Sequence, residues 1–131
     1  MDRRDKTRDF LRGYRLRAAA IETMPERIEA AERAGQSKKA EAIRRAAELA
    51  AAENLATDRA LELLTDRERL AVKILYIEAN EKDRIGRAMA AAGVTEPKSV
   101  YRLANRALDK VGVVILGPSR GMTKNGQLQK R

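Results

Sequence analysis

The chain of 131 residues contains no cysteine, no histidine and no tryptophan. Cysteine and histidine supply thiol nucleophiles, imidazole bases and the usual ligands of zinc. Their absence argues against thiol, imidazole or zinc chemistry. Paired carboxylates such as Asp66 and Glu68 fit the first turn of a helix better than an acid and base pair. We therefore expect a protein that is not an enzyme and that needs no metal or other cofactor.

Long apolar runs are also absent. No stretch approaches the roughly 20 apolar residues that a membrane-spanning helix needs, and the first ten residues, MDRRDKTRDF, lack the apolar centre of a signal peptide. The lack of cysteine fits a reducing compartment. We expect a soluble cytoplasmic protein with no membrane partner.

Charge is abundant, and its distribution is uneven. The net charge is +9. Residues 1–20 carry seven basic and three acidic side chains, and residues 95–131 carry eight basic and two acidic ones. Because the excess lies at the two ends, we expect the ends to meet a polyanion, with nucleic acid favoured over basic residues that are merely solvated.

The first 64 residues have helical patterns. One apolar face runs through Phe10, Leu11, Tyr14, Ala18 and Ile21, so a helix is predicted over residues 2–23. Pro25 should interrupt it, and a second piece, residues 26–34, should end at Gly35. From Lys38 to Leu64 there is neither proline nor glycine, which predicts one long helix of roughly 40 Å with Ser37 as its N-cap.

Small and apolar residues recur on the long helix at alternating steps of four and three, as in the seam of a heptad repeat. The seam residues assigned to oligomerisation are Ile43, Ala47, Ala50, Asn54, Leu61 and Leu64, and Thr57 shares their spacing. A polar residue in a seam, here Asn54, can fix register and partner number. The pattern fits either a homodimer or an intramolecular antiparallel coiled coil, and we expect a homo-oligomer.

Residues 65–111 are typical of three short helices. Thr65 and Glu68 form the sequence signature of a capping box. Gly93 can end the second helix in a left-handed conformation, Thr95 can cap the third, and Pro97 is tolerated in its first turn. The apolar run of residues 113–116 is expected to be a short strand or a plug over the core. A flexible basic tail should follow.

The third of these helices carries the candidate binding site. Lys98, Arg102, Arg106 and Lys110 recur every four residues beside a buried stripe, which produces a basic ridge on one helix face. Residues in the first turns of a recognition helix meet base edges, and later ones meet phosphate. The candidate DNA-binding residues are Glu96, Lys98, Ser99, Tyr101, Arg102, Asn105, Arg106 and Lys110.

Several of these residues carry a family resemblance. Leu64-Thr65-x-x-Glu68-Arg69, Leu75-Tyr76, Val100-Tyr101-Arg102-Leu103 and Arg106-Ala107-Leu108 resemble the promoter-reading region-four domain of bacterial sigma factors. With Phe10-Leu11-Arg12-x-Tyr14 and the long helix before them, the layout is similar to phage late-transcription regulators of the ArpU and RinA type. The resemblance implies a helix-turn-helix, duplex DNA as partner, possible contact with RNA polymerase, and a bacterial host cell.

The expected protein is all-α. Residues 1–64 form a helical hairpin or coiled-coil oligomerisation region, residues 65–117 a helix-turn-helix domain that binds DNA, and residues 118–131 a basic tail. The leading hypothesis is a sequence-specific regulator of phage type. Two alternatives stay open: the small subunit of a phage terminase, and a coiled-coil protein that binds RNA polymerase.

Overall fold

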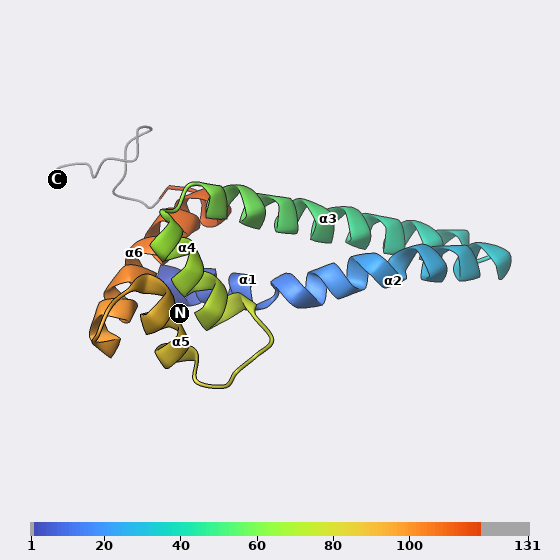
Figure 1. Ribbon diagram of the computed structural model, residues 1–131. Helices are drawn as coiled ribbons and strands as arrows, with labels where there is room; N and C mark the ends of the chain where they lie inside the picture. The colour runs from blue at the N-terminus through green and yellow to red at the C-terminus, as the bar shows by residue number, and fades with distance from the viewer. Residues whose placement is uncertain (1, 119–131) are drawn as a thin grey trace.

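The computed structural model describes residues 2–118, and every regular element in that range is helical (Figure 1). This confirms the predicted all-α class. Residues 119–131 of the predicted tail lie outside the described residues. In chain order the elements are α1 (Arg3–Arg12), α2 (Tyr14–Arg33), α3 (Ser37–Glu62), α4 (Asp66–Val72), the π-helical turn η1 (Lys73–Ile77), α5 (Arg84–Ala92) and α6 (Pro97–Leu116).

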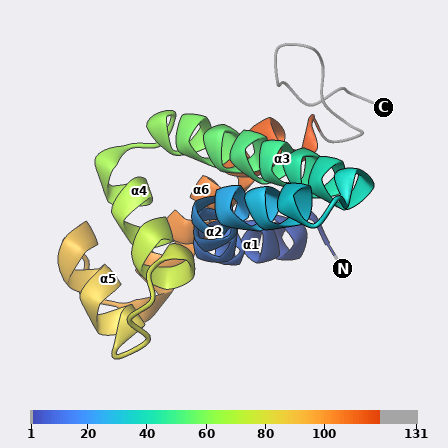
Figure 2. The ribbon, with the colours of Figure 1, turned by 90° about the vertical axis from the view of Figure 1, so that its right-hand side faces the viewer.

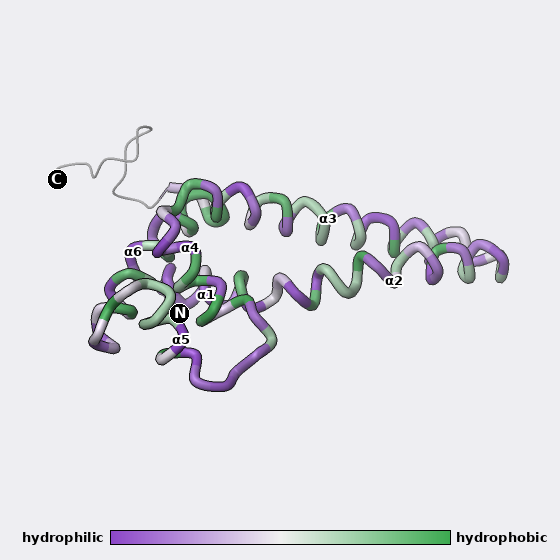
Figure 3. Tube along the Cα trace, viewed as in Figure 1, coloured by the Kyte–Doolittle hydropathy of each residue, from purple (hydrophilic) through white to green (hydrophobic). Residues whose placement is uncertain are grey.

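Helices α2 and α3 form an antiparallel hairpin that extends away from the other helices (Figures 1 and 2). Apolar residues recur along both of its helices between polar stretches (Figure 3). Near the tip, Met24 and Ala31 of α2 pack on Ala40 and Ile43 of α3. The chain therefore forms its own antiparallel pair, the intramolecular alternative that the heptad pattern left open.

The seam residues predicted to join two chains are used within one. Ala47 is partly buried, and the other five are buried: Ile43, Ala50, Asn54, Leu61 and Leu64. Because packing inside the chain already covers these side chains, a homo-oligomer would have to use a different surface.

The helix boundaries near Pro25 differ from the expectation. α2 runs through Pro25 without a break, although a proline inside a helix costs about 3 kcal/mol. Met24 and Ile28, on either side of Pro25, both pack into the hairpin core, and this burial opposes the cost. At the start of α3, Ser37 is the first helical residue and not the N-cap, which is Gln36.

The predicted helix over residues 2–23 is instead broken at Gly13, between α1 and α2. A polar network from the hairpin holds this break. Asn54 accepts a hydrogen bond of 2.7 Å from Arg17 Nε and donates one of 3.2 Å to the carbonyl of Tyr14. Arg17 also donates to the carbonyl of Phe10 and lies over the Phe10 ring. The seam asparagine thus fixes the junction between two helices of the same chain.

One core unites the two predicted regions at the base of the hairpin. Its buried residues come from α1, the end of α3, α4 and α6, and they are Leu11, Ala60, Leu61, Leu64, Val72, Ala107, Leu108 and Val111. A second cluster joins η1, α5 and α6 through Ile74, Leu75, Ala88, Val100 and Ala104. Tyr76 packs on both clusters. The N-terminal helix α1 is therefore part of the same packed unit as α6.

The π-helical turn η1 fits between these two cores. The amide of Glu78 donates to the carbonyl of Lys73, five residues earlier, over 2.9 Å. The wider turn brings Ile74 and Leu75 into one cluster while Ile77 packs on the other. The first helix of this region therefore ends in a turn that serves both cores.

The apolar run of residues 113–116 is not a strand, but Ile115 packs against the core, as the alternative expectation of a plug requires. The run forms the last turn of α6. At this end Arg3 donates hydrogen bonds to the carbonyls of Gly112 and Gly117, so that a side chain from α1 satisfies the end of α6. Thr7 lies against Gly112, where an added Cβ would be 3.0 Å from the Thr7 Oγ1. The close approach of α1 and α6 explains why the run stays helical.

A larger residue at this contact should loosen the fold. We expect Gly112→Leu to destabilise the protein by about 1–3 kcal/mol, because its Cβ would press on the hydroxyl of the buried Thr7 and force α1 away from α6. Urea unfolding followed by circular dichroism measures the change. Ala51→Leu, at an exposed position of α3, is the control and should alter stability little; equal effects from both substitutions would contradict the close packing.

Candidate nucleic-acid interface

Helix α6 is held by its buried stripe, and its opposite side faces outward. Val100 and Ala104 have no exposed surface and pack on α5 and η1. The turn before α6 contains Gly93 with φ of 67°, the left-handed conformation predicted for it. Glu96, and not Thr95 as predicted, is the N-cap, and Pro97 is in the first turn. This connection is short, and the helices on its two sides pack in the same cluster. It therefore fixes the position of α6 relative to α5.

The outward face of α6 is basic along its first half. Lys98, Arg102 and Arg106 are exposed and follow one another at intervals of four residues. Among residues 2–118 no carboxylate lies within ion-pair distance of these three cations. Their charge is therefore available to an outside anion. We call this row the α6 ridge.

The other candidate residues surround the ridge. Glu96 is exposed at the start of the helix, and Tyr101 has 49% of its surface exposed. Ser99 and Asn105 are half-buried, one on each flank of the ridge. Seven of the eight predicted residues thus lie on the α6 ridge, at its start or on one of its flanks.

Lys110 departs from the predicted row. Its ammonium group donates a hydrogen bond of 2.8 Å to Glu68, whose side chain is only 2% exposed. Burial by itself would raise the pKa of Glu68, but the hydrogen bonds from Lys110 and Thr65 outweigh it and hold that pKa below its ordinary value. The charge of Lys110 is paired with this buried carboxylate, so the row of cations that are unpaired within residues 2–118 ends at Arg106.

The same glutamate completes the predicted capping box. The amide of Glu68 donates to Thr65 Oγ1, and Glu68 Oε1 accepts from the amide of Thr65 at 2.9 Å. One side chain therefore caps α4 and anchors α6 through Lys110.

Helix α1 limits the outward face of α6 further along. Arg4 makes a two-pronged contact with Asp109, with both nitrogen–oxygen distances at 2.9 Å. These hydrogen bonds and the opposite charge of Asp109 raise the pKa of Arg4. Arg4 thus occupies the Asp109 carboxylate, and the part of α6 that carries these unpaired cations lies before this contact, over residues 98–106.

Each flank of the ridge has a groove. On one side a groove of about 230 Å³ is lined by Arg67, Val94, Ser99, Arg102, Leu103 and Arg106. Arg67 is oriented there by a hydrogen bond of 2.7 Å to the carbonyl of Ala92. On the other side a cleft of about 400 Å³ is lined by Arg8, Arg12, Leu75, Tyr76, Arg84, Ile85, Tyr101 and Asn105. We call it the α1–α6 cleft.

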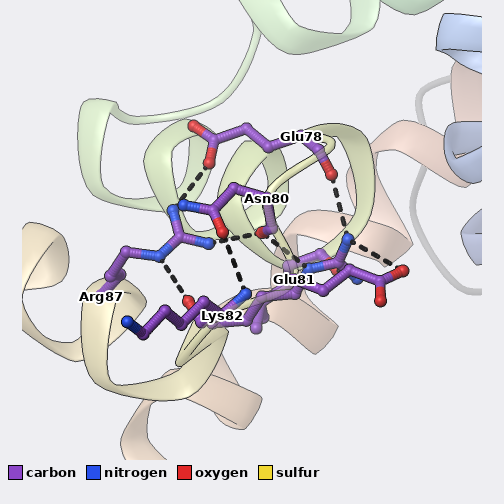
Figure 4. A network of polar contacts seen from close by, with 7 residues as sticks. Glu78, Asn80, Glu81, Lys82 and Arg87 are labelled. Carbon is purple, nitrogen blue, oxygen red and sulfur yellow. Dashed lines mark hydrogen bonds and ion pairs between the residues drawn. The ribbon is translucent and has the colours of Figure 1, made fainter.

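The loop between η1 and α5 is held by two arginines of α5, and Figure 4 shows one of them, Arg87, among the loop residues that it binds. Arg87 donates to the carbonyls of Asn80 and Lys82 and pairs with the Glu78 carboxylate at 2.8 Å. Arg84 donates to the carbonyls of Leu75, Glu78 and Asn80. These bonds order the loop beside the α1–α6 cleft and fix the direction of the Arg84 guanidinium.

Features of other site types are missing from the described part of the chain. Residues 2–118 hold no cluster of three or more acidic side chains suited to a metal ion. No helix there is both long and apolar enough to span a membrane.

Comparison with known proteins does not identify a family for this chain. The chain matches no family model, and neither curated proteins nor solved structures give a match. The interface must therefore be judged on its own residues.

Sequence reasoning missed the flanking arginines. Arg8 and Arg12 are 85 or more residues before the start of α6 in the chain, and only the packing of α1 on α6 brings them beside it. The spacing of Arg4, Arg8 and Arg12 on one helix face was a usable signal. The spacing does not indicate beside which other helix that face lies.

Proposed function

We propose that the protein is a sequence-specific DNA-binding regulator that places the first half of α6 in the major groove of duplex DNA. Helices α5 and α6 would act as a helix-turn-helix, with α6 as the recognition helix. The observation that carries the proposal is the α6 ridge, three exposed cations in one row on a helix whose other side is fixed by two cores.

The dimensions and chemistry of this surface support duplex DNA. An α-helix with its side chains is about 10–12 Å wide, which matches a major groove of about 12 Å. Arginine can pair with the major-groove edge of guanine through two hydrogen bonds, and glutamate can accept from cytosine. In this arrangement Glu96, Lys98, Ser99 and Arg102 read bases, and Arg106 holds the backbone.

A regulatory role of phage type is part of the proposal, because the layout of the chain is similar to phage late-transcription regulators of the ArpU and RinA type. The hairpin would then project from the DNA-bound end of the protein, where it could meet a partner such as RNA polymerase. Light scattering separates this proposal from the terminase alternative, because a terminase small subunit would form a large ring.

Removing charge from the α6 ridge tests the proposal. Duplexes selected by the wild-type protein from a random pool serve as the ligand. We expect Arg102→Ala/Arg106→Ala to weaken binding by at least about tenfold and to flatten its dependence on salt, because two phosphate or base contacts are lost. Fluorescence anisotropy at several salt concentrations measures both effects.

The matched control removes the same charge from the hairpin. Arg33 and Arg45 are exposed arginines of α2 and α3, far from α6 in the fold, and Arg33→Ala/Arg45→Ala should leave binding nearly unchanged. Equal binding by the ridge variant and the wild type at all salt concentrations would refute the proposal. So would failure of the wild type to retain any duplex at low salt.

A further inference from the structure

The α1–α6 cleft brings basic and aromatic side chains from four elements to one flank of the α6 ridge. Arg8 and Arg12 come from α1, Tyr76 from η1, Arg84 from α5, and Tyr101 from α6. Both α1 guanidinium groups lie 5.8 Å from the centre of the Tyr76 ring. Cation–π contacts with Tyr76 therefore hold two guanidinium groups side by side in the lining of the cleft.

The position of these arginines is fixed by the packing of α1. Arg4, Arg8 and Arg12 form one row on α1, and the first of them is locked to Asp109 of α6. Leu11 is fully buried in the core beneath. The row therefore runs beside α6 and points Arg8 and Arg12 toward the side where α6 is exposed.

The cleft has an excess of positive charge and no acidic residue in its lining. Arg8 and Arg12 have their own partners outside the lining, Asp5 at 2.7 Å and Asp9 at 3.6 Å. Both pairs join residues of the same helix that are partly exposed to solvent, where such pairs contribute little and can exchange partners. Arg84 is held mainly by neutral carbonyls. An anion would thus find several donors already placed.

The chemistry of the lining matches a backbone phosphate. Arginine binds phosphate through two parallel hydrogen bonds, and tyrosine and asparagine side chains are common phosphate donors in DNA complexes. A major groove is bordered by one phosphate strand on each side. The two flanks of the α6 ridge also carry one cationic groove each, the first with Arg67 and the second with Arg8 and Arg12.

We propose that Arg8 and Arg12, with Tyr101 and Asn105, grip the phosphate backbone of one DNA strand beside the groove that α6 enters. This inference rests on the proposed function and extends it to the N-terminal helix. The contact carries no base information, so it should strengthen binding to all duplexes by a similar factor.

The test replaces both arginines in the full chain. We expect Arg8→Gln/Arg12→Gln to weaken duplex binding by about tenfold and to reduce the slope of log affinity against log salt by about two. The preferred sequence, found by selection from a random pool, should not change. In a phosphate-ethylation interference experiment, ethylation of phosphates near one edge of the footprint should weaken binding by the wild type. The same modifications should no longer weaken binding by the variant.

Four further measurements keep the result interpretable. Arg8→Lys/Arg12→Lys keeps the charge but not the paired hydrogen bonds, so it should restore the salt dependence and only part of the affinity. Thermal unfolding reports whether each variant is folded. Arg33→Ala/Arg45→Ala is the control for charge lost elsewhere. Inorganic phosphate at the same ionic strength distinguishes a site for the free anion from one for DNA: if the duplex contact is real, phosphate should compete only weakly.

The outcomes separate this inference from the proposed function. If Arg102→Ala/Arg106→Ala weakens binding while Arg8→Gln/Arg12→Gln binds like the wild type with the same interference pattern, the cleft contact is wrong and the function stands. If the wild type binds no duplex, both are wrong. A change of sequence preference in the Arg8 and Arg12 variant would also overturn the assignment to the backbone.

Discussion

Leu11→Ala should destabilise the protein by about 2–5 kcal/mol, the range for a buried leucine cut back to alanine. Leu11 has no exposed surface and packs where α1 meets α3, α4 and α6. The cavity would open at the contact that holds α1 on α6. Urea unfolding followed by far-ultraviolet circular dichroism gives the free energy of unfolding.

The control is Leu16→Ala, the same change at a leucine of α2 that is 75% exposed. It should alter stability by less than about 0.5 kcal/mol. A similar small loss for Leu11→Ala would mean that α1 does not pack in the common core. Because Leu11 anchors α1, its variant should also lose part of the DNA affinity proposed for Arg8 and Arg12.

Lys110→Met should cost about 2–3 kcal/mol at pH 7, because it leaves a buried carboxylate without its cation. The loss is smaller than for a fully buried pair, since the Lys110 side chain is 44% exposed. Glu68 would keep only its capping contacts with Thr65, and its Oε2 atom has no hydrogen-bond partner among the described residues.

The deficit of this variant should depend on pH. In the wild type the pKa of Glu68 is lowered, so its stabilisation is complete above the unfolded value of about 4.3 and is lost as pH falls through the lowered pKa. In Lys110→Met burial remains without the cation and should raise that pKa. The penalty should then be relieved as pH falls from 7 to about 4, and the two proteins should become more alike.

Two comparisons check this account. Lys98→Met removes an exposed lysine of the same helix and should change stability little at any pH. Glu68→Gln/Lys110→Met removes both charges and should be more stable at pH 7 than Lys110→Met alone. A deficit for Lys110→Met that stays constant from pH 7 to 4 would show that Glu68 is not the group left unpaired.

Several features of the fold could be predicted because they depend on neighbours in the chain. The capping box at Thr65 and Glu68 and the left-handed Gly93 occur as predicted, since each is decided within about four residues. The long helix α3 is likewise set by alanine and leucine content and by the absence of proline and glycine.

Other features were predicted wrongly because distant residues decide them. Pro25 does not end its helix, since packing within the hairpin opposes its local cost. Residues 113–116 are helical because α6 continues beneath α1, with Arg3 binding carbonyls at its end. In both cases contacts between helices outweigh the local signal.

The sequence by itself determined the all-α class, the apolar stripe of α6 and the basic row Lys98, Arg102 and Arg106, because helical periodicity places these residues on opposite faces whatever the helix meets. Only the tertiary structure decided the partners of those faces. It pairs Lys110 with Glu68 and, across 105 residues, Arg4 with Asp109. Local spacing carries no information about such contacts, since they form only when burial of the shared core brings distant helices together.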